Sequence, residues 1–157
     1  MGDTNIDLKE LITMRARLLL NLGLVLEAEK KHQEAVDLLI KAAGLCKTHN
    51  LREDFYRTQI ALGGIYERNR DYDLALAHFE TAVEVDNSSL KAEARFLQAE
   101  LLLKIGKWTE SRKILVLLYV TENLSQNLKH QVEKCLRIGM VKVKDRLREY
   151  NYFCGFI

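Results

Sequence analysis

Apolar and polar residues alternate along this chain with the period of a helix. From residue 6 to residue 29 the apolar side chains recur every three or four residues, which places them on one face of a helix. The same period predicts six further helices, at about 33–48, 51–69, 72–85, 91–105, 108–121 and 125–150. Proline, which interrupts helix interiors, is absent from all 157 residues. The sequence therefore predicts an all-α protein.

Helix start signals stand at two of the expected boundaries. Asp3 or Thr4 can accept a hydrogen bond from a free backbone N–H at the start of the first helix. Asn50, with Glu53 three residues on, resembles a capping box.

Small residues recur at a fixed offset within successive helix pairs. The first copy reads Leu22-Gly23-x2-Leu26, then Ala35-x3-Leu39-x2-Ala42. A small residue in one helix is followed 12 residues later by another in the next helix, in the pairs Gly23 and Ala35, Gly63 and Ala75, and Ala99 and Ser111. Large residues at the remaining positions nest between such helices, so each copy predicts a helical hairpin.

This pattern is typical of tetratricopeptide (TPR) repeats. It predicts a right-handed solenoid with three long-helix repeats at about 16–49, 56–89 and 92–122, extended by a helix at 5–15 and capped by one at 125–150. The aligned small residues are 40 and 36 residues apart, against about 34 in an ordinary repeat. Because the links lack Gly and Pro, we interpret the extra residues as added helical turns. We expect one domain over residues 1–157.

Charge and cysteine usage narrow the class of protein. The chain carries 24 Lys and Arg against 22 Asp and Glu, and the basic excess lies in the last helix. We interpret it as a solvated face and expect no direct nucleic-acid contact. An odd count of three cysteines suits a reducing, intracellular compartment. No apolar run approaches the ~18 residues of a membrane span.

The sequence carries no catalytic or metal-binding pattern. The four histidines lie at predicted turns or outer faces, without a matched nucleophile or metal-ligand spacing: His32, His49, His78 and His130. The glycines occur singly, so no loop is suited to cradle a phosphate. We therefore expect no enzyme activity, no cofactor and no metal. Trp108 is predicted to pack across the turn between two helices rather than to hold a ligand.

The functional surface is expected on the concave face, which the first helix of each TPR repeat lines. The residues predicted to form this partner-binding groove are Arg17, Leu20, Leu24, Glu27, Arg57, Ile60, Glu67, Arg68, Glu93, Phe96, Glu100, Leu103 and Lys104. They form an apolar stripe bordered by charges of both signs. For Leu20, Leu24 and Phe96 an equal alternative is that they extend the core.

One TPR function is excluded by residue type. TPR domains that bind the acidic tails of chaperones use a clamp of Lys, Asn and Arg, because a carboxylate site needs cations. This chain has Leu20, Leu24, Ala61, Glu93 and Leu97 at the clamp positions.

Two stretches resemble the TPR array of Tonsoku-like proteins: Met14–Leu24, and Asn50 through Gly63. The resemblance implies a nuclear scaffold in the repair of stalled replication forks by homologous recombination. The ankyrin and leucine-rich modules of that family do not occur in these residues. The alternative is a cytoplasmic TPR adaptor that organises signalling or cell-polarity complexes. In either case we expect a protein or peptide ligand in the groove, no membrane contact, and self-association through exposed solenoid ends.

Overall fold

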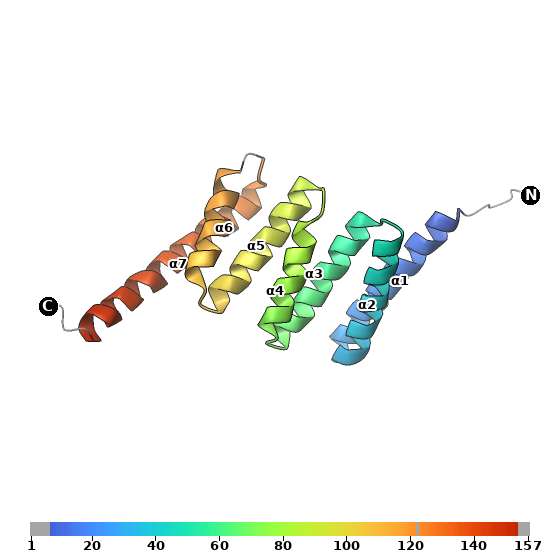
Figure 1. Cartoon of the computed structure of the whole chain (residues 1–157), viewed down its shortest axis with the longest axis horizontal. Coiled ribbons are helices and arrows are strands. Elements are labelled where there is room, and N and C mark those ends of the chain that lie inside the picture. The colour runs from blue at the N-terminus through green and yellow to red at the C-terminus, as the bar shows by residue number, and fades with distance from the viewer. Residues whose placement is uncertain (1–6, 122, 154–157) are drawn as a thin grey trace, which may run out of the picture. The chain divides into compact units, whose positions relative to one another are not determined.

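Seven helices make up the described part of the chain in the computed structural model, which covers residues 7–121 and 123–153, without the side chains of 147 and 149–153. They are α1 (Leu8–Ala28), α2 (His32–Thr48), α3 (Arg52–Arg68), α4 (Tyr72–Val83), α5 (Ser88–Lys104), α6 (Trp108–Val120) and α7 (Gln126–Phe153) (Figure 1). No strand occurs within these residues. The predicted all-α TPR solenoid class is confirmed.

The chain divides into two compact units, residues 1–91 and 92–157. In the first unit α1 packs on α2, α2 on α3, and α3 on α4. In the second unit α5, α6 and α7 share one core. Each unit therefore contains the helical hairpins expected from the sequence, while the single domain over 1–157 stays a prediction.

The turn inside each hairpin has the same backbone form. Its middle residue is left-handed, with φ of 64° at Lys30, 66° at Arg70 and 84° at Gly106. The next N–H donates back across the turn to the carbonyl five residues earlier, from Lys31 to Leu26, from Asp71 to Tyr66 and from Lys107 to Leu102, each at 2.9 Å. These bonds satisfy carbonyls that a helix end leaves free. Only the third turn uses glycine, the residue that adopts this conformation without strain.

Asn50 ends α2 and does not cap α3, so the predicted capping box is wrong. Asn50 has a φ of 56°, and the N–H of Leu51 donates to the carbonyl of Cys46 at 2.8 Å. Asn is favoured here because its short polar side chain tolerates the left-handed conformation. At the start of α1 it is Asp7 that accepts, from the N–H of Lys9 at 3.3 Å. Asp3 and Thr4 lie outside the described residues.

The unequal repeat lengths come from the second helices of the hairpins. Helix α2 has 17 residues and α4 has 12. The prediction of added helical turns is therefore confirmed for the first repeat. Helix α4 ends at Val83, two residues before the predicted end, and Asn87 then caps α5 by accepting from the N–H groups of Ser89 and Leu90 at 3.0 and 3.2 Å.

The small residues lie where the two helices of a hairpin touch. A β-carbon on Gly23 would stand 2.9 Å from Cγ of Leu39, and one on Gly63 would stand 2.7 Å from Cδ1 of Phe79. Such distances are too short for side chains, so the predicted role of these glycines as packing positions is confirmed. In the third hairpin Ala99 is fully buried, and the hydroxyl of Ser111 donates to its carbonyl at 2.7 Å.

Candidate functional site

The first unit presents most of the predicted groove residues on α1 and α3. Arg17, Leu24, Arg57 and Arg68 are exposed, and Glu27, Ile60 and Glu67 are partly exposed. Leu24 retains 45% of its accessible surface. These residues give α1 and α3 an exposed apolar side chain among charged ones.

Leu20 does not belong to this exposed surface. It is 7% exposed and packs in a core cluster with Val36 and Leu39 of α2 and Leu62 of α3. Its burial therefore favours the alternative, that Leu20 extends the core, over a place in the groove. Leu20 stands three residues before Gly23, on the face of α1 that packs against α2.

Two ion-pair systems join helices in the first unit. Nε of Arg17 on α1 donates to both carboxylate oxygens of Asp54 on α3, at 3.0 and 3.2 Å. Nε of Arg68 on α3 donates to Glu27 on α1 at 3.1 Å, and Nδ1 of His32 lies 2.6 Å from the second oxygen of that carboxylate. The side chains of Asp54 and Glu27 are only 6% and 9% exposed. The structure thus brings together Glu27 and Arg68, and it pairs two of the three predicted arginines, Arg17 and Arg68, with carboxylates.

In the second unit, some of the predicted groove residues lie on the surface and others lie in the core. Glu93, Glu100 and Lys104 on α5 are exposed. Phe96 and Leu103 are 8% and 9% exposed and belong to the core cluster that α5, α6 and α7 share. The placement of Phe96 as an exposed aromatic anchor is therefore corrected, because residues of α7 cover this side of α5.

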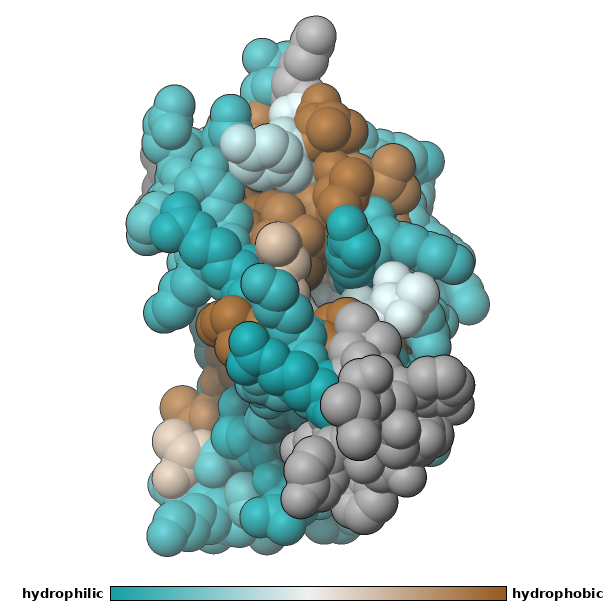
Figure 2. Space-filling view, turned by 90° about the vertical axis from the view of Figure 1, so that its left-hand side faces the viewer, coloured by the Kyte–Doolittle hydropathy of each residue, from teal (hydrophilic) through white to brown (hydrophobic). Residues whose placement is uncertain are grey.

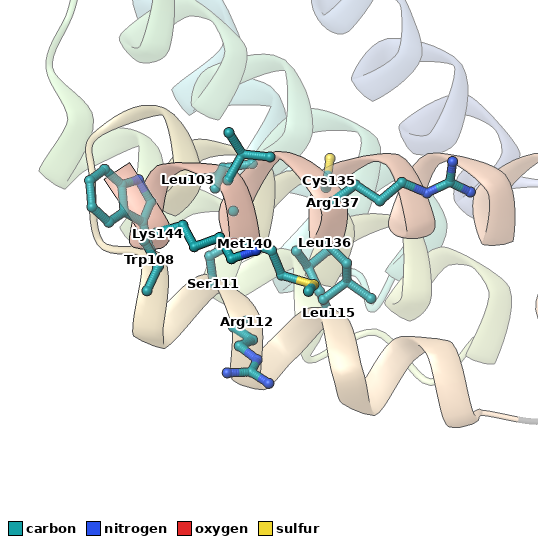
Figure 3. Close-up of a pocket in the computed structure, with 13 residues that line it drawn as sticks. Leu103, Trp108, Ser111, Arg112, Leu115, Cys135, Leu136, Arg137, Met140 and Lys144 are labelled. Carbon is teal, nitrogen blue, oxygen red and sulfur yellow. The ribbon is translucent and has the colours of Figure 1, made fainter. Parts of the chain in front are cut away.

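A pocket that the sequence did not reveal lies among α5, α6 and α7, with a volume of about 420 Å³. Its walls are mainly apolar and include Leu103, Trp108, Leu115, Leu136, Met140 and Val143. In Figure 3, Trp108 lies at one end, Leu115 and Leu136 lie toward the other, and Met140 lies between them. Gly139 on α7 was a signal for this site, since it recurs at the spacing of the earlier packing glycines.

Cationic side chains accompany the pocket. Arg112, Arg137 and Lys144 line it, and no described lining residue is acidic. Figure 2 looks onto the side where α6 and α7 lie in Figure 1, and shows apolar side chains between hydrophilic ones. Among the described side chains of α7, the exposed large apolar ones are Ile138, Met140, Val141 and Val143. The surface is suited to an amphipathic ligand of negative charge.

Trp108 closes one end of the pocket and packs against the core of the second unit. The guanidinium of Arg146 lies 4.6 Å from the centre of its ring, within the range of a cation–π interaction. Its buried indole Nε1 has no hydrogen-bond partner among the described residues. A buried donor without an acceptor costs free energy, so Trp108 is held here by its packing and by Arg146 and not by a hydrogen bond of its indole.

Two cysteines and one histidine among the described residues have pKa values that burial shifts. Burial raises the pKa of the Cys46 thiol and of the Cys135 thiol, which disfavours the nucleophilic thiolate. His78 is half-buried against Tyr66, and burial lowers its pKa. Within residues 7–121 and 123–153, no three His, Cys, Asp or Glu side chains are placed to share a metal ion. None of the described helices combines the length and hydropathy needed to cross a bilayer.

The comparisons with known proteins agree with the fold. Two family models described as tetratricopeptide repeat match residues 14–88 and 60–126. A Tonsoku-like protein of Danio rerio is 36% identical over 99 residues, which are 63% of this chain and 7% of that relative. A Tonsoku-like protein of Drosophila melanogaster is 32% identical over 146 residues, which are 89% of this chain and 10% of that relative. No solved structure matches the chain.

The relatives are much longer than the chain, which covers 7% and 10% of the two described above. A Tonsoku-like protein of Bos taurus, 27% identical over 147 residues, is covered to 11%. Together the two family models span 14–126, which contains most of α1 and all of α2 to α6. The chain belongs to the tetratricopeptide-repeat family, and over most of its length it is similar to one segment of Tonsoku-like proteins.

Proposed function

We propose that this chain is a non-enzymatic protein-binding segment of a Tonsoku-like scaffold that acts in the nucleus, in the repair of replication forks by homologous recombination. The similarity to Tonsoku-like proteins over most of the chain supports the setting. The TPR fold supports the type of activity, since stacked hairpins expose long surfaces on which other proteins dock.

The observation that carries the proposal is the exposed face of α1 and α3. Leu24 offers an apolar contact that a partner can bury, and on the same two helices Arg17 and Arg68 donate to the carboxylates of Asp54 and Glu27. Side chains fixed before binding lose less conformational entropy when a partner docks. We infer that Leu24 is the apolar centre of this surface and that the arginines, with Arg57, set the charge of the partner.

The test is proximity labelling of the full-length protein in cells under replication stress. Wild type is compared with Leu24→Asp and with Leu74→Asp, which alters a leucine of similar exposure, 49%, on α4. We expect nuclear labelling of replication and repair proteins that Leu24→Asp reduces and Leu74→Asp preserves. Cytoplasmic labelling of signalling or polarity proteins would instead favour the adaptor function. Equal effects of the two variants would show that Leu24 has no special role in partner binding.

A further inference from the structure

The last turns of α6 present adjoining apolar side chains to solvent. Val116, Leu117 and Val120 are 43%, 63% and 67% exposed. Val120 stands four residues after Val116 and three after Leu117, so the three side chains share one face of the helix. Single exposed apolar residues are common, whereas adjoining ones mark a surface that another molecule covers. We call these three residues the α6 patch.

The earlier hairpins show that neighbouring repeats do not cover these positions. Counted from the small packing residue of each second helix, which is Ser111 in α6, the equivalents are Ile40, Lys41 and Gly44 in α2, and Glu80, Thr81 and Glu84 in α4. The α2 residues are exposed although α3 and α4 follow, and a β-carbon on Gly44 would meet nothing within 4 Å. The α4 residues are exposed, or partly exposed at Thr81, although α1 and α2 precede them. The exposure of the α6 patch is therefore a property of this repeat position, whichever hairpins stand on either side.

The residue types at this position distinguish α6 from the other two second helices. Helix α2 has one large apolar residue there and α4 has none, whereas all three are large and apolar in α6. Valine is a weaker helix former than the glutamates at the equivalent α4 positions, so helix stability does not account for Val116 and Val120. Core packing does not account for them either, because they are exposed. Contact with another molecule would explain both.

Cationic side chains flank the α6 patch. Arg112 and Lys113 are exposed one turn before it and have no ion-pair partner among the described residues. On the side of α7, Nζ of Lys129 lies 5.3 Å from the centre of the Tyr119 ring. The acidic residue of α6, Glu110, stands in the first turn, about 10 Å from Leu117 along the helix axis. The charge beside the patch is therefore positive.

We propose that the α6 patch binds an amphipathic helix of a partner protein that carries acidic side chains beside its apolar stripe. The patch is a ridge on a helix, and such a ridge fits between the side chains of a second helix. Acidic residues along the edge of that helix would meet Arg112, Lys113 and Lys129. A nucleic acid would satisfy the cations but would leave the apolar side chains in water. The patch belongs to the second unit and the face of α1 and α3 to the first, so this inference does not rest on the proposed function.

A matched pair of peptides tests the chemistry of the partner. Both are fluorescein-labelled amphipathic helices of about 18 residues, long enough to form a helix in isolation, with leucines on one face. One peptide has Glu at the flanking positions and the other has Lys. We expect the Glu peptide to bind the whole chain in anisotropy titrations at least about tenfold more tightly than the Lys peptide, with a ratio that narrows as salt rises.

The decisive variant is Leu117→Ala, and Ile40→Ala on α2 is its matched control. Each replaces an exposed apolar residue, at 63% and 53%, with the best helix former, so both thermal midpoints should stay or rise. Affinity for the Glu peptide should fall at least about tenfold in Leu117→Ala and stay unchanged in Ile40→Ala. Lys113→Glu should weaken binding and its salt dependence, whereas Lys47→Glu, an equal charge change on α2, should not.

Failure of the Glu peptide to bind, equal binding of the Lys peptide, or equal effects of Leu117→Ala and Ile40→Ala would each overturn the proposal. So would binding to vesicles of phosphatidylserine and phosphatidylcholine, or self-association in sedimentation velocity, that Leu117→Ala abolishes. The patch would then serve a membrane or a second copy of the chain. Peptide binding that this chain shows and the full-length protein lacks would assign the patch to another segment of the same protein.

Discussion

The aromatic ring of Phe79 lies directly against Cα of Gly63, so that a β-carbon at residue 63 would stand 2.7 Å from Cδ1 and 3.0 Å from Cζ of the ring. Phe79 is 2% exposed, and protein interiors are close-packed, so its ring cannot shift without moving its neighbours. Because α3 and α4 would have to separate, Gly63→Ala should lower the free energy of unfolding by about 1–3 kcal/mol, and Gly63→Leu by more.

Gly44 provides the matched control for that prediction, measured by urea denaturation. It also lies inside a helix, but a β-carbon there meets nothing within 4 Å. Gly44→Ala should therefore stabilise the protein by about 0.5–1 kcal/mol through helix propensity. If both alanine variants shift stability in the same direction, the hairpin contact does not explain the glycine at residue 63.

The three hairpin turns predict a stabilising substitution. Lys30 and Arg70 adopt φ values of 64° and 66°, a conformation that costs a residue with a β-carbon about 1 kcal/mol. Lys30→Gly and Arg70→Gly should each raise the denaturation midpoint, while Gly106→Ala at the equivalent turn should lower it. A lower midpoint for the two glycine variants would show that the side chains of Lys30 and Arg70 contribute more than their backbone strain costs.

The ion pair between Arg17 and Asp54 predicts that replacing the arginine destabilises the protein more than replacing the aspartate. Asp54 is buried, at 6% side-chain exposure, whereas 57% of the Arg17 side chain faces water. Arg17→Leu leaves a buried carboxylate without its cation, and Asp54→Leu leaves an arginine that water can solvate. Thermal melts should therefore show a lower midpoint for Arg17→Leu than for Asp54→Leu, and the opposite order would show that the pair is not the main support of Asp54.

His78 predicts a pH dependence of stability. Burial lowers the pKa of His78 in the folded protein below its ordinary value of 6.5, while the ring donates from Nδ1 to Gln59 at 2.7 Å. The unfolded chain then binds the proton more tightly, so stability is full above about pH 6.5 and falls as the pH drops toward the folded-state pKa. His78→Gln should reduce the fall of the thermal midpoint between pH 7 and pH 5, and His130→Gln, on an exposed histidine, should leave it unchanged.

The sequence assigned both Phe96 and Leu24 to the groove, but their burial predicts opposite effects of substitution on stability and on partner binding. Phe96 lies in the core of the second unit, so Phe96→Ala should cost about 3–5 kcal/mol of stability. Leu24 is exposed, so Leu24→Asp should change the thermal midpoint little while it weakens partner binding. A stable Phe96→Ala variant with impaired binding would show that Phe96 contacts the partner and does not stabilise the core.

The helices, their pairing and the contacts of Gly23 and Gly63 could be predicted from the sequence because they depend on short-range information. A helical period fixes which residues share a face, and an interval of 12 residues spans one hairpin turn, so the small residues of neighbouring helices must meet. The same period predicted which residues share a face with Leu24 on α1 and which share a face with Arg68 on α3. Asn50 was misread because the same residue type serves at either end of a helix.

Burial of the groove residues was decided only by the tertiary structure. Leu20, Leu24 and Phe96 are all apolar residues of first helices, and nothing in the local sequence separates the exposed one from the two buried ones. Phe96 is buried because residues of α7, more than 30 positions away, pack into the same core as α5. The open face at Gly139 arises in the same way, since its exposure depends on which helix packs there and not on α7 itself. The sequence determined which faces the helices have, and long-range packing decided which of those faces remain free to bind.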